Sequence, residues 1–361
     1  MKKNKSIPSW AKISFAVFIL STFVYFIAIN NRYVADFIND TASVALRAVM
    51  SSVTYFLPFS LFEMLIILSP LILIILLVTL LGGKRGSRCG ARTVFSLLGV
   101  ISLIMTMYIF MLGIGYRTTS LSSKLGIDNP SDISPEELYQ TAVIVRDEVN
   151  ALSEKVDIVG VETVMPYSTD ELSKKIIDAY DRMNAEYGLV YNFPSVAKPV
   201  YFSTVMSDLR ITGIYSFFTG EANVNVEYPD YGLPFTVAHE FAHQRGICRE
   251  NEANFTAFLV CIASDDDYIR YSGYLSLYEY LSSAVYRTDK ELYYELNDGL
   301  SATAVMDIAA ANAVYQAHKD SILGEINDRM NDTYLKLNGT QGNVTYGYVV
   351  RLAVGYYRDK R

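Results

Sequence analysis

Residues 234–246 have the sequence PFTVAHEFAHQRG, and this stretch decides what kind of fold the chain should have. His239 and His243 are two of only three histidines among the 361 residues. On a helix, positions i and i+4 lie on one face, so both imidazoles can reach the same metal ion, with Glu240 beside them. The H-E-x-x-H pattern therefore predicts the active-site helix of a zinc hydrolase, which begins at the proline and ends at the glycine.

The residue types in this pattern suit hydrolysis at zinc. Zinc prefers neutral imidazoles and carboxylates in a tetrahedral shell, and a hydrolytic site leaves one position for water. The metal lowers the pKa of that water, and Glu240 is the predicted general base that takes its proton. We therefore expect one Zn²⁺ per chain, held by His239, His243 and a third ligand.

Two glutamates downstream are candidates for the third ligand. Glu250 opens the sequence Glu-x-x-Ala-Asn, which is similar to the E-x-x-A-D/N signature of several zincins. In those proteins the first glutamate binds the metal and the Asp or Asn orients a histidine, which favours Glu250 with Asn254 behind a histidine. Glu252 would instead lie level with His243 if a tight turn joins two antiparallel helices, at about 1.5 Å rise per residue. Both alternatives stay open.

Two other side chains are weaker candidates for the site. Cys248 could add a thiolate ligand, although a cysteine in a turn between helices more often packs in the core. His318 could stabilise a tetrahedral oxyanion, although a single histidine on a long predicted helix at 303–336 is more often structural. The three cysteines do not make a disulfide framework.

The segment at 221–226 predicts where a substrate would bind. It alternates polar and apolar residues, which is typical of a strand with one exposed side. We expect it to form an edge strand beside the active-site helix, because zincins commonly bind an extended peptide by adding it to such an edge. The predicted substrate-binding residues are Glu221, Ala222, Asn223, Val224 and Asn225.

The N-terminal third of the chain predicts a membrane anchor. Apolar runs at about 10–30, 60–81 and 93–116 are each long enough to cross a bilayer as a helix. Basic residues precede the first run and fill the loop at 82–92, so the positive-inside rule places the N-terminus in the cytoplasm. Three crossings then place residues 118–361 outside it. The lipid bilayer is thus an expected partner.

Residues 118–361 have the composition of a globular domain that is large enough for a substantial core. Helix-start patterns at Ser134 and Ser168, each followed three residues later by glutamate, predict two capped helices. We expect a mostly α architecture, with three transmembrane helices within 1–117 followed by an α+β zincin-like domain of the gluzincin type with a small sheet. The net charge of −7 argues against nucleic acid as a partner.

Several stretches together resemble an uncharacterised family of bacterial membrane proteins that is known by a domain-of-unknown-function label. These stretches are PFS at 58–60, GIY at 213–215, TGEANVN at 219–225, HEFAHQRG at 239–246, ENEANF at 250–255 and YG at 346–347. The resemblance covers nearly the whole chain. It implies a protein of the bacterial cytoplasmic membrane with three N-terminal spans and an extracytoplasmic zincin-like domain, and it supplies no substrate.

The sequence thus predicts a membrane-anchored zinc metallopeptidase. It would hydrolyse an extracytoplasmic peptide or protein near the surface of the cytoplasmic membrane. The nucleophile would be a metal-activated water, with Glu240 as the general base. The alternative hypothesis is a non-catalytic membrane sensor or scaffold with a structural or vestigial metal site. In that case Cys248 could close the metal shell.

Overall fold

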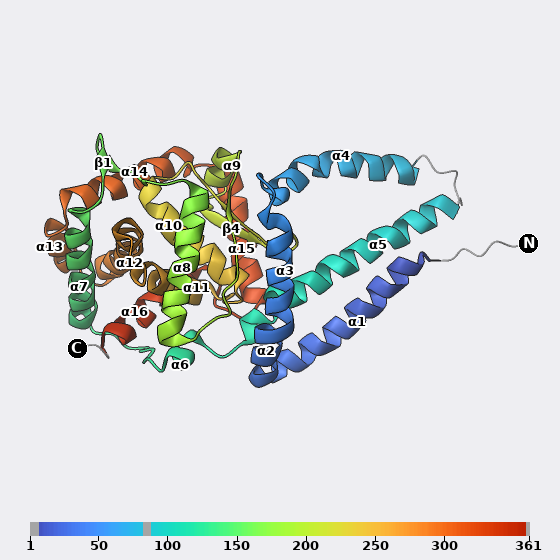
Figure 1. Cartoon of the computed structure of the whole chain (residues 1–361), viewed down its shortest axis with the longest axis horizontal. Coiled ribbons are helices and arrows are strands. Elements are labelled where there is room, and N and C mark those ends of the chain that lie inside the picture. The colour runs from blue at the N-terminus through green and yellow to red at the C-terminus, as the bar shows by residue number, and fades with distance from the viewer. Residues whose placement is uncertain (1–6, 82–87, 359–361) are drawn as a thin grey trace, which may run out of the picture.

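The computed structural model describes residues 7–81 and 88–358, and it is mostly helical (Figure 1). Three segments are long and apolar enough to cross a membrane, at Ser9–Asn30, Leu61–Val78 and Ala91–Arg117. The three predicted apolar helices are therefore confirmed. They are formed by α1 (Ser9–Asn30), α4 (Leu61–Leu81) and α5 (Arg88–Tyr108), the last continued by η2 (Ile109–Gly113) and η3 (Gly115–Arg117). The basic loop predicted at 82–92 lies partly outside the described residues.

The segment between the first two apolar helices packs on the C-terminal part of the chain. It forms α2 (Arg32–Ile38), η1 (Asn39–Ser43) and α3 (Val44–Tyr55). The buried Arg47 side chain donates a hydrogen bond to the Met111 carbonyl at 3.2 Å. The same guanidinium lies where a Cβ at Gly246 would stand. The boundary at residue 117 thus divides the chain by composition and not by packing.

The helices that follow begin where their capping residues predict. Ser134 Oγ accepts a hydrogen bond from the Glu137 amide at 3.1 Å and starts α7 (Pro135–Ser153). Ser168 and Glu171 form a complete capping box at the start of α8 (Thr169–Tyr187). The remaining short elements before the sheet are α6 (Leu121–Leu125) and the hairpin of β1 (Ile158–Val159) and β2 (Glu162–Thr163).

A three-stranded sheet lies next to the predicted active-site helix. Its strands are β3 (Ala197–Pro199), β5 (Glu221–Val224) and β4 (Gly213–Ser216), in that order, with α9 (Ser203–Asp208) between β3 and β4 in the chain. β5 pairs in parallel with β3 and antiparallel with β4. The prediction that 221–226 forms an exposed edge strand is therefore wrong, because β5 is the central strand and all four of its residues are buried.

The polar residues of β5 have buried partners instead of solvent. The Glu221 carboxylate accepts hydrogen bonds from the backbone amides of Leu61 and Phe62 at 2.9 and 2.8 Å. Asn223 Oδ1 accepts a hydrogen bond from Ser60 Oγ at 2.6 Å. These contacts cap the first turn of α4, where four backbone N–H groups have no partner within the helix. The alternation of polar and apolar residues in β5 thus reflects contacts of Glu221 and Asn223 with the start of α4.

The helix that carries the H-E-x-x-H motif, α10 (Leu233–Gln244), lies in the centre of the main core and packs on α11 (Glu250–Ile262), β4 and β5. The other helices surround this centre (Figure 1): α12 (Asp267–Thr288), α13 (Lys290–Asp298), α14 (Ala302–His318), α15 (Ile322–Leu337) and, after η5 (Gly342–Tyr348), α16 (Val349–Arg358). The single helix predicted at 303–336 is wrong, because the chain leaves the helical conformation at 319–321 and forms two helices, α14 and α15.

Candidate metal centre

The turn between α10 and α11 brings the candidate ligands together. Gly246 has a φ of 98°, a left-handed conformation that glycine adopts without a steric cost. The Ile247 amide donates to the Ala242 carbonyl at 3.0 Å, which closes the end of α10. The turn reverses the direction of the chain, and α11 begins directly after it at Glu250. The first residue of α11 therefore lies beside the two histidines of α10.

Three side chains form a compact cluster of possible ligands. The Nε2 atoms of His239 and His243 lie 3.4 and 3.5 Å from the same oxygen, Oε2 of Glu250. The ligand atoms of the three residues all lie within 4.8 Å of one another. The two imidazole rings are nearly perpendicular, at 87°, with centroids 4.6 Å apart. The structure therefore brings Glu250 to the two histidines, as one of the two alternatives predicts.

The cluster fits a zinc ion in both ligand type and spacing. Zinc binds nitrogen and oxygen at about 2.0–2.1 Å, so tetrahedral ligand atoms lie roughly 3.3–3.4 Å apart. The two separations from Glu250 Oε2 are close to that value. His243 Nδ1 lies 2.9 Å from the Ile247 carbonyl, which can only accept, so the proton is on Nδ1 and Nε2 is left free to bind a metal. Two imidazoles and one carboxylate match the donor set of hydrolytic zinc sites.

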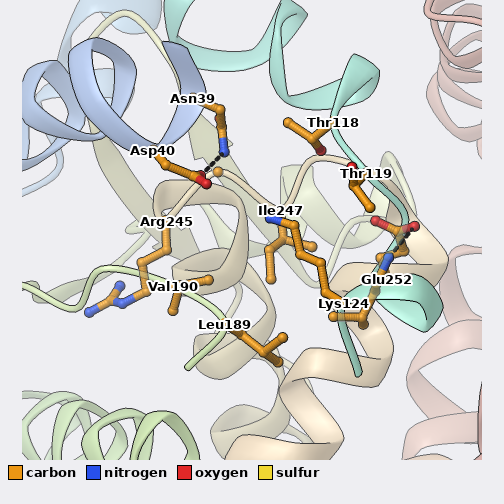
Figure 2. A pocket seen from close by; sticks show the side chains of 12 residues that line it. Asn39, Asp40, Thr118, Thr119, Lys124, Leu189, Val190, Arg245, Ile247 and Glu252 are labelled. Atoms are coloured by element: carbon orange, nitrogen blue, oxygen red, sulfur yellow. Dashed lines mark hydrogen bonds between the residues drawn. The ribbon is translucent and has the colours of Figure 1, made fainter. Parts of the chain in front are cut away.

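Glu252 lies outside this cluster. Its carboxylate accepts hydrogen bonds from the Arg249 guanidinium at 3.0 and 3.1 Å and from the Leu121 amide at 3.1 Å. It lines a separate small pocket together with Arg245 and Lys124 (Figure 2). None of the three clustered residues lines that pocket. The alternative in which Glu252 is the third ligand is therefore not supported by the geometry.

The charges of the cluster are strongly coupled. Burial alone would lower the pKa of His243, but the Glu250 and Glu240 carboxylates raise it to about 9. Burial opposes ionisation of Glu250, but the two histidines hold its pKa well below the ordinary value. In the absence of a metal, a proton on the imidazole therefore balances the carboxylates. A divalent cation would take the place of that proton.

Glu240 has the environment of a general base. Burial raises its pKa, which the neighbouring His239 and His243 oppose. Its carboxylate accepts a hydrogen bond from the Tyr215 amide. Its Oε2 atom is buried and has no hydrogen-bond partner within the described residues. A carboxylate with a raised pKa and one free oxygen can accept a proton from a reacting group and release it again.

The free edge of the sheet at this site belongs to β4. The Asn225 amide donates to the Thr212 carbonyl at 2.8 Å, so this opposed pair is hydrogen-bonded. Hydrogen-bonded and non-bonded pairs alternate in an antiparallel ladder, so the backbone groups of Gly213 and Tyr215 point away from β5. The bond between the Tyr215 amide and Glu240 agrees with this direction. Among the described residues no further strand pairs with this edge, which runs beside the general-base candidate and is half-buried at Gly213 and Ile214 and buried at Tyr215 and Ser216.

The predicted supporting role of Asn254 is not seen. Its Nδ2 atom and the Nδ1 atom of His239 are both buried without a hydrogen-bond partner in the part of the chain that the structure describes. His243 is oriented by the carbonyl of Ile247, three residues after the end of α10, and not by a side chain. Backbone partners of this kind depend on the turn and leave no pattern in the sequence.

Two tyrosines near the cluster could not be singled out among the 28 in the sequence. Burial raises the pKa of the Tyr280 and Tyr334 hydroxyls, and the nearby Glu250 carboxylate adds to the effect. Both hydroxyls are therefore protonated donors at neutral pH. They come from α12 and α15, which lie far from the motif in the sequence.

His318 and Cys248 do not join the cluster. His318 Nδ1 lies 2.8 Å from Asp208 Oδ1, so this histidine pairs α14 with α9. The Cys248 thiol lies 3.7 Å from the Gly246 carbonyl and is buried against Gly115 at the end of the third apolar helix. Both residues thus serve packing.

The fold and the site define a mostly helical protein with three candidate membrane-spanning helices and a buried His/Glu cluster suited to a metal ion. Residues 37–354 match the family model described as "Protein of unknown function (DUF3810)". The chain belongs to this family, and the match begins in the segment before α3 and includes the last two apolar helices. A search of the curated proteins and a search of the solved structures found no match.

Proposed function

We propose that this protein is a membrane-anchored zinc metallopeptidase. The observation that carries the proposal is the convergence of two Nε2 atoms on one oxygen of Glu250, next to the Glu240 carboxylate. The free backbone edge of β4 beside Glu240 supports it, because a peptide can bind there by main-chain hydrogen bonds. Metal-dependent peptide-bond hydrolysis needs these components: a metal site, a base and a way to hold an extended chain.

Each residue has a defined task in the proposed reaction. His239, His243 and Glu250 hold the zinc, which when bound activates a water and polarises the scissile carbonyl. Glu240 accepts the proton from the attacking water and delivers it to the departing amine. Its bond from the Tyr215 amide fixes the carboxylate between the helix and the strand. The backbone groups of Gly213 and the Tyr215 carbonyl align the substrate.

The proposed setting is the bacterial cytoplasmic membrane. The three apolar helices would cross it with the N-terminus in the cytoplasm, and residues 118–361 would lie outside. The substrate would be a peptide or protein near the outer surface of that membrane. The basic residues before the first crossing and in the loop between the second and third crossings support this orientation.

The test compares the full chain with its Glu240→Gln variant in detergent or vesicles. We expect about one zinc per chain in both proteins, measured by elemental analysis. We expect hydrolysis of a fluorescence-quenched degenerate peptide library by the wild type alone. Equal hydrolysis by both would contradict the proposed mechanism. A zinc-loaded wild type without hydrolysis, together with zinc loss in Cys248→Ala, would support the non-catalytic alternative.

A further inference from the structure

The candidate active site is fixed directly on the end of a membrane-spanning candidate helix. The Arg249 guanidinium, in the turn that leads to Glu250, donates to the carbonyls of Tyr116 and Thr118 at 3.0 and 2.6 Å. Cys248 in the same turn packs so closely on Gly115 that a Cβ there would clash with the thiol. This turn therefore cannot move away from the bilayer without breaking its own contacts.

The free edge of β4 leads from the catalytic residues to the candidate spans. The turn after β4 carries Phe217 and Phe218. The Phe217 ring contacts Tyr108 of α5 with centroids 5.6 Å apart, and the Phe218 ring contacts Phe62 of α4 at 5.7 Å. The hairpin tip thus bridges the two helices with aromatic side chains, which are typical of the membrane–water interface.

The separation of α4 and α5 at the hairpin is held by specific bonds. Glu221 and Asn223 hold the start of α4 on the sheet, as described above. Glu63 adds bonds from the amides of Tyr201 and Phe202 at 3.0 and 2.8 Å. α4 and α5 therefore lie apart where they meet the globular part and approach each other toward their far ends, while α1 follows α5 (Figure 1).

We propose that the peptidase site acts on the juxtamembrane stretch of a protein that is anchored in the same bilayer by a transmembrane helix. The anchor helix would lie beside α4, none of whose membrane-spanning residues is buried in the structure. The chain leaving it would pass the hairpin tip and pair with β4. This inference rests on the proposed peptidase function and adds the class of substrate.

The geometry also gives the position and the polarity of the cut. Tyr215, whose amide meets Glu240, is two residues before Phe217, which is about 7 Å at roughly 3.4 Å per residue. Cleavage therefore falls within a few residues of the bilayer. A peptide that pairs with β4 in the more stable antiparallel direction has its N-terminal side toward the hairpin tip. The anchor helix of the substrate is therefore N-terminal to the cut.

The test uses the full-length protein loaded with zinc in phospholipid vesicles. The probe is a reporter with an N-terminal leucine–alanine transmembrane helix followed by a degenerate stretch of about 40 residues. New N-termini are mapped by mass spectrometry, with the Glu240→Gln protein as the matched control. A soluble broad-specificity protease gives the accessibility of each position.

At each position of the reporter we divide the cleavage that depends on Glu240 by the cleavage by the soluble protease. We expect this ratio to be at least tenfold higher in the first six residues after the transmembrane helix than in the rest of the stretch. Cleavage spread evenly along the stretch, or concentrated far from the helix, would overturn the inference and leave the peptidase function intact. Absence of any cleavage that depends on Glu240 would overturn the proposed function and this inference with it.

Discussion

Gly213 of β4 lies directly against Glu240 of α10: a Cβ on Gly213 would stand 2.6 Å from Glu240 Oε1. The two residues come from different elements, and their contact sets the distance between the backbone of β4 and the Glu240 carboxylate. A side chain at Gly213 would therefore have to displace the Glu240 carboxylate. Its φ is not in the left-handed range, so space and not backbone conformation demands glycine here.

Replacing Gly213 with alanine should displace the Glu240 carboxylate while zinc is retained. A misplacement of about 1 Å can cost roughly 100-fold in rate, so we expect a loss of peptide hydrolysis of that order. Gly232→Ala is the matched control, because a Cβ there meets no atom within 4 Å. Unchanged hydrolysis in Gly213→Ala would show that the contact has no role in catalysis.

The two neighbouring glutamates should respond differently to removal of their charge. Glu250→Gln should weaken zinc binding by more than the roughly 10–100-fold typical of losing an outer hydrogen-bond partner. Glu252→Gln should retain zinc, because its carboxylate contacts Arg249 and Leu121 instead. Zinc affinity measured by competition with a chelator distinguishes them. The opposite order of effects would make Glu252 the ligand.

Glu221 should affect stability and not substrate binding. Its carboxylate accepts two backbone hydrogen bonds at the start of α4, and hydrogen bonds to charged groups contribute about 1.5–3 kcal/mol each. Glu221→Gln should therefore lower the thermal unfolding temperature, whereas the exposed Glu325→Gln should not. If Glu221→Gln raises KM at unchanged stability, the substrate-binding role predicted from the sequence would be restored.

Glu279 should make stability dependent on pH. Burial raises its pKa to about 7, which a hydrogen bond from the Tyr231 hydroxyl partly opposes. A glutamate in the unfolded chain titrates near pH 4.3, so the folded state binds more protons between roughly pH 4.3 and 7. Stability should fall as pH rises through this window. Thermal unfolding should show Glu279→Gln to be more stable than the wild type at pH 8 and equal to it at pH 4; a constant difference would contradict this assignment.

The sequence predicts the parts of the site that depend on local spacing. The i, i+4 histidines, the helix around them and the capped helices at Ser134 and Ser168 all follow from short patterns. The third ligand could not be assigned, because it depends on how the chain turns between Gly246 and Glu250. In the structure the Glu252 carboxylate accepts hydrogen bonds from Arg249 and from the Leu121 amide. Leu121 lies more than 120 residues before Glu252, so no local sequence pattern could reveal this contact.

The prediction of the edge strand failed for a different reason. Alternation of polar and apolar residues at 221–226 indicates a strand with two different faces, but it does not say what each face meets. The polar face of β5 meets the start of α4, and Glu221 and Asn223 are buried there. The edge strand beside the motif helix, β4, has no such alternation. Its Gly213 packs on Glu240, and the groups that β4 offers at this edge are those of its backbone.

Arg47 and Ser51, which lie between the first two apolar helices, support the motif helix and the turn after it, and this affects the order in which the site assembles. The Arg47 guanidinium packs against Gly246, and Ser51 Oγ accepts a hydrogen bond from Gln244 Nε2 at 3.1 Å. These supports emerge from the ribosome about 190 residues before the motif, and they meet it only if both segments reach the same side of the membrane. In the proposed enzyme, the turn that carries the metal ligands would therefore be supported only after both segments have been synthesised and lie on the same side of the membrane.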